Sequence, residues 1–116
     1  MAKEGTTRYY STMQEDKVAE LIGGYRVANS GAGLFNKGDV VQKDASLLVE
    51  CKTPTSEKDS FSIKKEWILK NKEEAHSKRM FNNAVAFTFG PQQANYFIID
   101  ESTFRFLVEK LIEEYK

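Results

Sequence analysis

The sequence contains very few of the residues that form disulfides, zinc sites and membrane spans. Its 116 residues include one cysteine, Cys51, and one histidine, His76. A single cysteine excludes an internal disulfide, and the two residues together are too few for a zinc site with His or Cys ligands. No apolar run approaches the roughly 18 residues needed to cross a bilayer, and the polar N-terminus has no apolar signal core. We therefore expect a cytoplasmic protein with no membrane association.

The charges balance over the whole chain but not along it. Its 17 Lys and Arg offset its 17 Asp and Glu, and a neutral protein is not expected to bind nucleic acid indiscriminately. Between Cys51 and Met80, however, eight basic residues accompany five acidic ones, and the balance reverses from Phe81 onward. A basic middle segment could follow a phosphate backbone. A solvated helix of mixed charge is the ordinary alternative, and the charge count by itself favours it.

The length and the patterning predict one α/β domain in which a central mixed β-sheet is flanked by helices. We expect a flexible N-terminal arm at 1–10 and a single domain at 11–116. Capping residues, turn residues and apolar periodicity predict the elements in order: a helix from Ser11 or Thr12 to Gly23-Gly24, a strand at 25–28, a loop at 29–38, a hairpin at 39–52, a short alternating segment at 61–63, a basic helix at 64–79, strands at 84–89 and 96–99, and a helix capped by Ser102. The last helix carries an apolar stripe that is either core or dimer interface: Phe104, Leu107, Val108, Leu111 and Tyr115.

The strand predicted at 47–52 contains two charges that a buried strand should not have. Apolar side chains occupy both of its faces, a pattern typical of a strand covered on both sides. Glu50 and Lys52 nevertheless share the face of Leu48, because side chains alternate with a period of two. Desolvating two charged groups costs free energy that a purely structural strand would avoid. We interpret both as candidate functional residues, with a strand-end salt bridge as the structural alternative.

A third charge is expected beside them from the preceding strand. If 44–45 form a two-residue turn, Asp39 lies directly opposite Glu50 on the neighbouring strand, whereas a longer loop would shift this register. Directly opposed residues share a face, with Cβ atoms roughly 4.5 to 5.5 Å apart. The two carboxylates would therefore repel and raise each other's pKa. A divalent cation bound between them would remove the conflict.

These residue types suit a magnesium site that hydrolyses phosphate esters. Mg²⁺ is typically held by one or two carboxylates, with waters and substrate phosphate as further ligands. We expect Asp39 and Glu50 to bind it, the backbone carbonyl of Cys51 to add an oxygen, and Mn²⁺ to substitute for Mg²⁺. Lys52 could orient or deprotonate the attacking water and stabilise the charge that develops on the phosphate. Glu15 borders the buried face of the first helix and could support the metal directly or through a water.

Asp39 followed by Glu50-Cys51-Lys52 resembles the (P)D…(D/E)XK signature of a large nuclease superfamily, with Gly38 in place of the usual proline. Within that superfamily, the chain is most similar to archaeal-type Holliday junction resolvases, including phage-encoded ones. The resemblance implies a restriction-endonuclease-like core in a single nuclease domain at 11–116. It also implies a homodimer that cuts opposing strands of a four-way DNA junction, in a prokaryotic cell or a phage-infected host.

The same resemblance assigns roles outside the two central strands. Glu15 matches the glutamate of the family's first helix, so it joins the expected catalytic residues. Ser30 lies where the family has a serine that helps to position a DNA phosphate. The basic helix beginning at Lys64-Lys65 lies where the family contacts DNA. We expect Lys64, Lys65 and Lys58 to contact the phosphate backbone.

Two other functions are open at the level of sequence. The first is a nuclease of the same superfamily that acts on flaps, damaged sites or foreign duplex DNA. The second is a non-catalytic DNA-binding or scaffold subunit that retains the fold. Cleavage of branched and linear DNA would separate the first from a resolvase, and titration with a divalent cation would identify the second.

Overall fold

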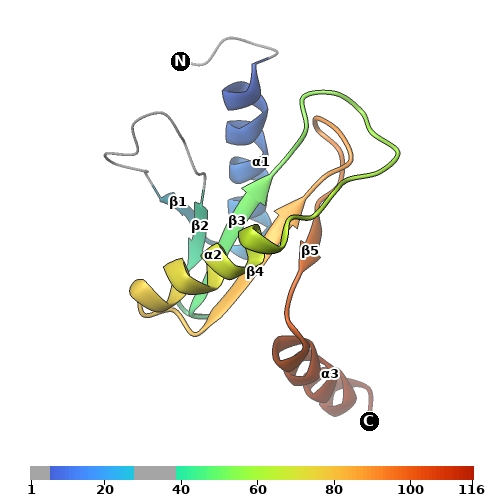
Figure 1. Ribbon diagram of the computed structural model, residues 1–116. Helices are drawn as coiled ribbons and strands as arrows, with labels where there is room; N and C mark the ends of the chain where they lie inside the picture. The colour runs from blue at the N-terminus through green and yellow to red at the C-terminus, as the bar shows by residue number, and fades with distance from the viewer. Residues whose placement is uncertain (1–5, 28–38) are drawn as a thin grey trace.

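The fold is organised around a mixed sheet in which five strands lie side by side in chain order, in the part of the chain that the structure describes. The computed structural model describes residues 6–27 and 39–116 (Figure 1). Its elements are α1 (Thr7–Ile22), β1 (Tyr25–Val27), β2 (Asp39–Gln42), β3 (Leu47–Lys52), α2 (Lys65–Ser77), β4 (Asn82–Phe87), β5 (Tyr96–Ile98) and α3 (Glu101–Tyr115). Strands β3 and β4 are parallel, and the other neighbouring pairs are antiparallel.

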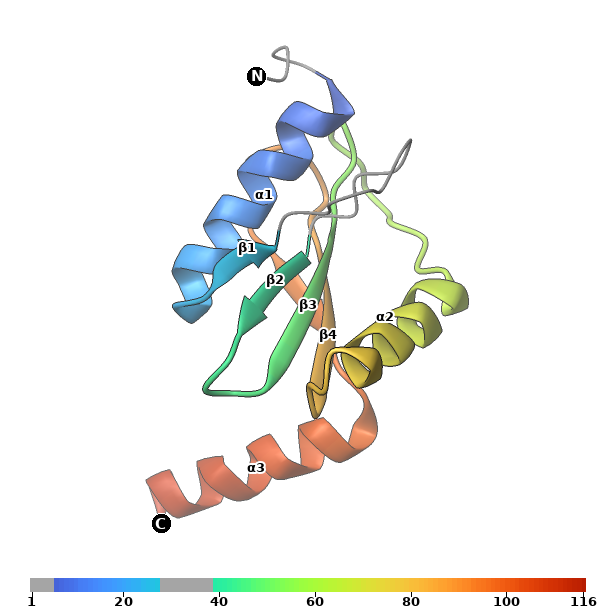
Figure 2. The same cartoon turned by 90° about the vertical axis from the view of Figure 1, so that its left-hand side faces the viewer.

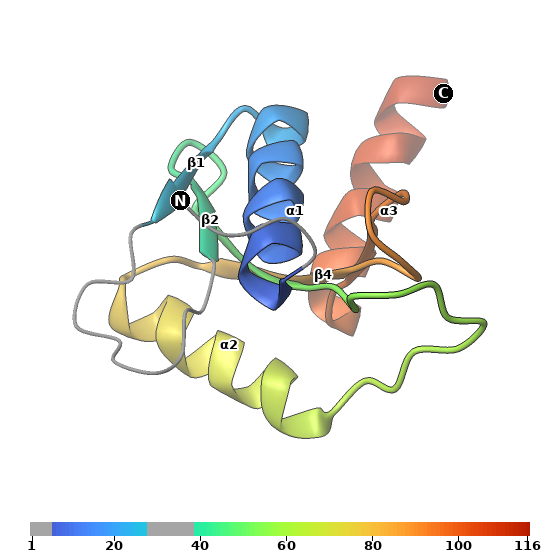
Figure 3. The same cartoon turned by 90° about the horizontal axis from the view of Figure 1, so that it is seen from above.

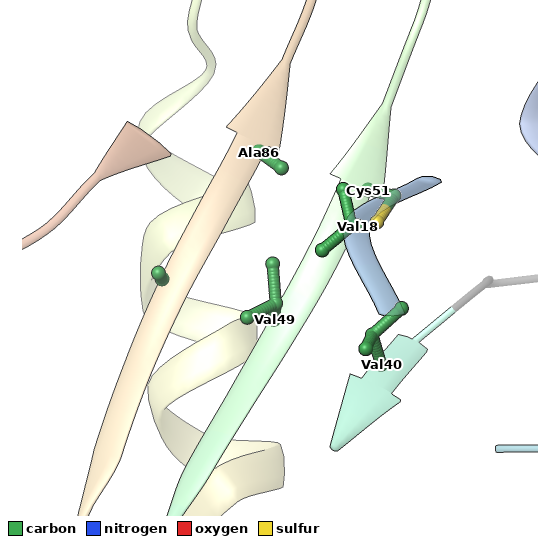
Figure 4. Close-up of a cluster of buried hydrophobic side chains, with 6 residues drawn as sticks. Val18, Val40, Val49, Cys51 and Ala86 are labelled. Carbon is green, nitrogen blue, oxygen red and sulfur yellow. The ribbon is translucent and has the colours of Figure 1, made fainter. Parts of the chain in front are cut away.

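Two helices cover the opposite faces of this sheet, α1 on one side and α2 on the other (Figures 2 and 3). The predicted α/β class, with a mixed sheet flanked by helices, is confirmed. On the α1 side, one helix residue packs with residues of the three central strands (Figure 4): Val18, Val40, Val49, Cys51, Ala84 and Ala86. On the α2 side, Ala75 packs with Val41 and Leu48. A side chain that shares the face of Leu48 therefore lies on the side of the sheet that α2 covers.

Helix α1 begins earlier than the sequence predicted. A start at Ser11 or Thr12 is wrong, because Thr6 caps the helix and its hydroxyl accepts a hydrogen bond from the Tyr9 N–H at 3.2 Å. A threonine hydroxyl at this position satisfies one of the backbone N–H groups that a helix start leaves without a partner. The flexible arm predicted at 1–10 is therefore partly helical, and its first five residues lie outside the described residues.

The other boundaries differ by smaller amounts. The predicted end of α1 is confirmed, since Gly23 has the left-handed φ of 68° that favours glycine after a helix. Residues 61–63 form no strand, and β4 begins at Asn82 instead of at residue 84. The loop predicted at 29–38 lies outside the described residues.

Helix α3 extends from the end of β5 and buries none of its side chains (Figures 1 and 2). Its cap is Asp100 and not the predicted Ser102, because Asp100 Oδ1 accepts a hydrogen bond from the Thr103 N–H at 2.9 Å and its charge complements the positive end of the helix dipole. Four residues of the apolar stripe are exposed, from 45% at Leu107 to 83% at Tyr115, and Val108 is half-buried. A core role for the stripe is therefore wrong within the described structure, and an interface role stays a prediction.

No helix in the described ranges is both long and apolar enough to cross a bilayer.

Candidate active site

The β2–β3 hairpin brings two carboxylates face to face. Asp39 is the direct partner of Glu50 across the two strands, which confirms the predicted register. A backbone hydrogen bond of 3.0 Å between the ends of Lys43–Ser46 closes the predicted two-residue turn, and the Gln42 side chain accepts hydrogen bonds from two N–H groups inside it. Both carboxylates are buried, with exposed fractions of 3% for Asp39 and 4% for Glu50. The local sequence of the hairpin is therefore sufficient to place them together.

Lys52 adds a positive charge to the same face. Its Nζ lies 4.0 Å from Glu50 Oε1 and 4.7 Å from the centroid of the Trp67 ring. The negative face of an indole attracts an ammonium group. Trp67 is supported in turn by Phe61, at 6.0 Å between ring centroids. The N-terminal part of α2 thus holds the Lys52 ammonium beside the Glu50 carboxylate.

Two further residues at the C-terminal end of α2 belong to this cluster, and the sequence did not single them out. Lys78 Nζ lies 3.9 Å from Asp39 Oδ2 and 3.3 Å from Glu74 Oε1. The side chains of Glu74 and Asp39 share a hydrogen bond. One sequence signal could have found them: Glu74 and Lys78 are spaced i,i+4, so their side chains lie close together on the helix surface. Ala75, between them in the sequence, is buried against the sheet. The cluster therefore contains three acidic and two basic side chains.

The surroundings of Asp39 favour its protonated form. Burial is the largest cause, the hydrogen bond with Glu74 and the charge of Glu74 follow, and together they raise the pKa of Asp39 to about 8. The Lys78 ammonium lowers this pKa, and the Glu50 carboxylate makes the smallest of the contributions that raise it. The raised pKa agrees with the expectation for opposed carboxylates. Desolvation, however, contributes more than the repulsion between the two strands.

Glu15 lies on the helix that covers the other face of the sheet. It is 8% exposed, and Arg26 Nη1 lies 3.8 Å from its Oε1. Burial raises the pKa of Glu15, and Arg26 opposes this shift. The Cys51 thiol is on the same side, and burial raises its pKa as well. The side chain of Cys51 thus points away from Glu50, as predicted, and a role for Glu15 at a metal stays a prediction.

The residues expected to contact DNA lie at or before the start of α2. Three of them have exposed side chains: Lys58, Lys64 and Lys65. Lys64 precedes the first turn of α2, and its Nζ lies 5.8 Å from the Trp67 ring centroid. Lys64 and Lys52 therefore share one aromatic neighbour. The fourth expected contact, Ser30, lies outside the described residues.

The paired carboxylates fit a Mg²⁺ ion that is held mainly by water and substrate. In residues 6–27 and 39–116, no three His, Cys, Asp or Glu side chains are placed so that together they could hold a metal ion, so these ranges form no closed protein cage for a metal. Mg²⁺ usually retains several waters and takes only one or two protein carboxylates. Asp39 Oδ1 is buried and accepts no hydrogen bond from the described chain, so it is an oxygen that could bind such an ion. Two carboxylates such as Asp39 and Glu50 are a donor set that suits Mg²⁺.

No protein-family model, curated protein or solved structure matches the chain. The class of the protein is therefore defined by its own fold and charges. It is an α/β domain whose central hairpin carries a buried carboxylate pair with a lysine beside it.

Proposed function

We propose that the protein is a Mg²⁺-dependent, structure-selective DNA endonuclease of the PD-(D/E)XK type, with a restriction-endonuclease-like core. The observation that carries the proposal is the pairing of Asp39 with Glu50, with the Lys52 ammonium 4.0 Å from the Glu50 carboxylate. Placing two acidic groups together in a buried position is costly for folding. Such costs are concentrated at functional sites, where charge arrangement serves chemistry.

The residues predicted from the sequence have distinct roles in phosphodiester hydrolysis. Asp39 and Glu50 would hold Mg²⁺, with the Cys51 carbonyl as a further oxygen and Glu15 as support through a water. The bound ion would supply an activated water and stabilisation of charge on the phosphate. Lys52, held against Trp67, orients or deprotonates the attacking water and stabilises the negative charge that develops on the phosphate oxygens. Mn²⁺ should substitute, because carboxylate and water ligands suit it as well.

Four-way junctions or other branched DNA are the substrates that we favour. Three exposed lysines at or before the start of α2 would contact the phosphate backbone: Lys58, Lys64 and Lys65. Ser30 would position one phosphate. The zero net charge limits binding that depends on phosphate charge alone. Selection would then depend on the shape of the DNA. Such an enzyme would work in the cytoplasm of a prokaryotic cell or of a phage-infected host, in DNA recombination and repair.

A homodimer would bring two active sites to one junction, and α3 offers a surface for it. Five large side chains of the helix are between 45% and 83% exposed on one side: Phe104, Leu107, Leu111, Ile112 and Tyr115. They present roughly 500 Å² of apolar surface, which is more than half of the ~800 Å² that each partner buries in a standard interface. Pairing with a second copy of α3 would explain why this helix buries no side chain in the monomer.

Cleavage of synthetic four-way junctions, flaps and linear duplexes tests the proposal. The wild type should cut junctions preferentially with Mg²⁺ and lose activity in EDTA. Asp39→Asn should remain folded, bind junctions and fail to cut them. Equal cleavage of all three substrates would refute junction selectivity and leave a nuclease with another target.

A non-catalytic DNA-binding subunit is the second candidate, and one observation favours it. Lys78 Nζ lies 3.9 Å from Asp39 Oδ2, so the protein itself partly compensates the Asp39 charge without a metal. Calorimetric titration with Mg²⁺ and with Mn²⁺ decides between the two functions. Absence of binding, together with a Lys52→Ala variant that behaves like the wild type on DNA, would support the subunit and overturn the enzyme.

A further inference from the structure

The C-terminal end of α2 lies over Asp39 because one small residue anchors it. Ala75 is 1% exposed and packs with Val41 and Leu48, which share the sheet face of Asp39 and Glu50. Glu74 and Lys78 lie next to Ala75 on the helix surface. They form an ion pair in which Lys78 Nζ is 3.3 Å from Glu74 Oε1. The helix therefore places Glu74 and Lys78 beside Asp39.

Lys78 lies at one oxygen of the Asp39 carboxyl group and does not contact the other. Its Nζ approaches Oδ2 at 3.9 Å, whereas Oδ1 is buried and accepts no hydrogen bond from the residues that the structure describes. Lys52 stands in the same relation to Glu50, with its Nζ 4.0 Å from Oε1. Each of the two opposed carboxylates thus has an ammonium group at its edge. The repulsion between the two buried acids is therefore reduced by one lysine of the hairpin itself, Lys52, and by one from the end of α2, Lys78.

The ammonium of Lys78 and a bound divalent cation cannot both remain close to Asp39 at low cost. Two like charges about 4 Å apart repel by roughly 4 kcal/mol even at an effective dielectric constant of 20. Of the groups involved, Lys78 is the one that can move, because its side chain is 35% exposed and that of Asp39 is 5% exposed. The flexible four-carbon stem of a lysine also allows its charge to return to water while the helix stays in place.

We propose that Lys78 is a positioning residue that acts as a built-in counter-ion: its ammonium lies at the edge of the Asp39 carboxyl group in the metal-free protein and is displaced when a divalent cation binds the ionised group. This inference rests on the proposed function, since it requires a cation at Asp39 and Glu50. Glu74 retains the displaced ammonium nearby, because it is the closer of its two acidic partners. The affinity for metal is then set by a competition between the ion and an internal lysine.

Isothermal titration calorimetry with Mg²⁺ on Lys78→Met tests this inference, with denaturation of the metal-free proteins as a second readout. Removing the competing charge should tighten Mg²⁺ binding by about five- to tenfold, which corresponds to roughly 1 kcal/mol. It should also lower the stability of the metal-free protein at neutral pH, because Glu74 loses its ammonium partner. Lys78→Arg keeps the charge and should bind Mg²⁺ like the wild type. Lys72→Met is the matched control, because Lys72 is an ion-paired lysine of the same helix whose partner is Asp100, at 3.2 Å.

The outcomes separate this inference from the proposed function. If the wild type binds Mg²⁺ and Lys78→Met binds it equally or more weakly, the counter-ion role is overturned while the metal site stands. If the wild type binds neither Mg²⁺ nor Mn²⁺, the metal site itself is refuted, and the counter-ion role with it. Should Lys78→Met fail to fold without metal, Lys78→Gln is measured instead with the same expected increase in affinity.

Discussion

Replacing Asp39 with asparagine should stabilise the metal-free protein, and increasingly so as the pH rises. Burial and the hydrogen bond with Glu74 raise the pKa of Asp39 from its ordinary value of 3.8 to about 8. In the unfolded chain the same carboxyl group ionises near its ordinary value. Between these two pKa values the folded state keeps a proton that the unfolded state has lost, so the stability of the fold decreases as the pH rises through this window. An asparagine cannot ionise, so Asp39→Asn should lack this decrease.

The size of the effect follows from the pKa shift. One pKa unit corresponds to roughly 1.4 kcal/mol, so a rise from 3.8 to about 8 has an upper bound of roughly 6 kcal/mol once the unfolded carboxyl is ionised and the folded one is not. Relaxation and water penetration reduce the cost of buried charges in real proteins. We therefore expect the advantage of Asp39→Asn over the wild type to grow by about 2 kcal/mol between weakly acidic and weakly basic pH.

Urea denaturation in EDTA, measured on both proteins at several pH values from about 4 to 8, checks this expectation. Asp44→Asn is the matched control, because Asp44 is exposed in the turn between β2 and β3, and it should follow the wild type at every pH. Addition of Mg²⁺ near pH 8 should stabilise the wild type and leave Asp39→Asn unchanged. Parallel pH profiles for the wild type and Asp39→Asn would refute the reasoning, because they would mean that folding does not change the ionisation of Asp39.

Three further predictions concern Lys52, the cap of α3 at Asp100, and the exposed apolar side of α3. Lys52→Met should slow junction cleavage at least about a hundredfold in single-turnover assays and leave Mg²⁺ affinity within about twofold, whereas loss of Mg²⁺ binding would make Lys52 part of the metal site. Asp100→Ala should lower the stability by about 1 kcal/mol in thermal unfolding, and Asp100→Asn by less. The hydrogen bond from Thr103 lowers the pKa of Asp100 to about 2, so the advantage of the wild type over Asp100→Ala should be present at neutral pH and be lost as the pH falls through about 4 towards 2. Leu111→Glu should convert a dimer into a monomer in light scattering while Lys110→Glu does not, and an unchanged mass would exclude α3 as the interface.

The carboxylate pair could be predicted from the sequence because its geometry is local. Side chains in a strand alternate, and a two-residue turn fixes which residues face each other. The structure supports that turn with the Gln42 side chain, which accepts a hydrogen bond of 2.7 Å from the Asp44 N–H. No information from the rest of the fold was needed to place Asp39 opposite Glu50.

The part of the site contributed by α2 could not be predicted, because this helix has no apolar stripe to show which side faces the sheet. Its buried residues are Asn71 and Ala75, and Asn71 Nδ2 donates a hydrogen bond of 2.8 Å to the Ala84 carbonyl of β4. A helix that buries only an asparagine and an alanine has a weak apolar periodicity in its sequence. Glu74 and Lys78 therefore could not be distinguished from the other charged residues of the helix until its orientation was known.

The connectivity of the sheet determines the order in which the charges can meet. Asp39 and Glu50 belong to one hairpin, and hairpins of this size close within microseconds. Lys78 lies at the end of α2, and its contact with Asp39 joins residues far apart in the sequence, so it should form more slowly than the hairpin. Before α2 docks, the two acids face each other without the Lys78 charge. Divalent cations in solution should therefore stabilise the newly formed hairpin. The ion that the finished enzyme would use in catalysis would then also serve as a template for its folding.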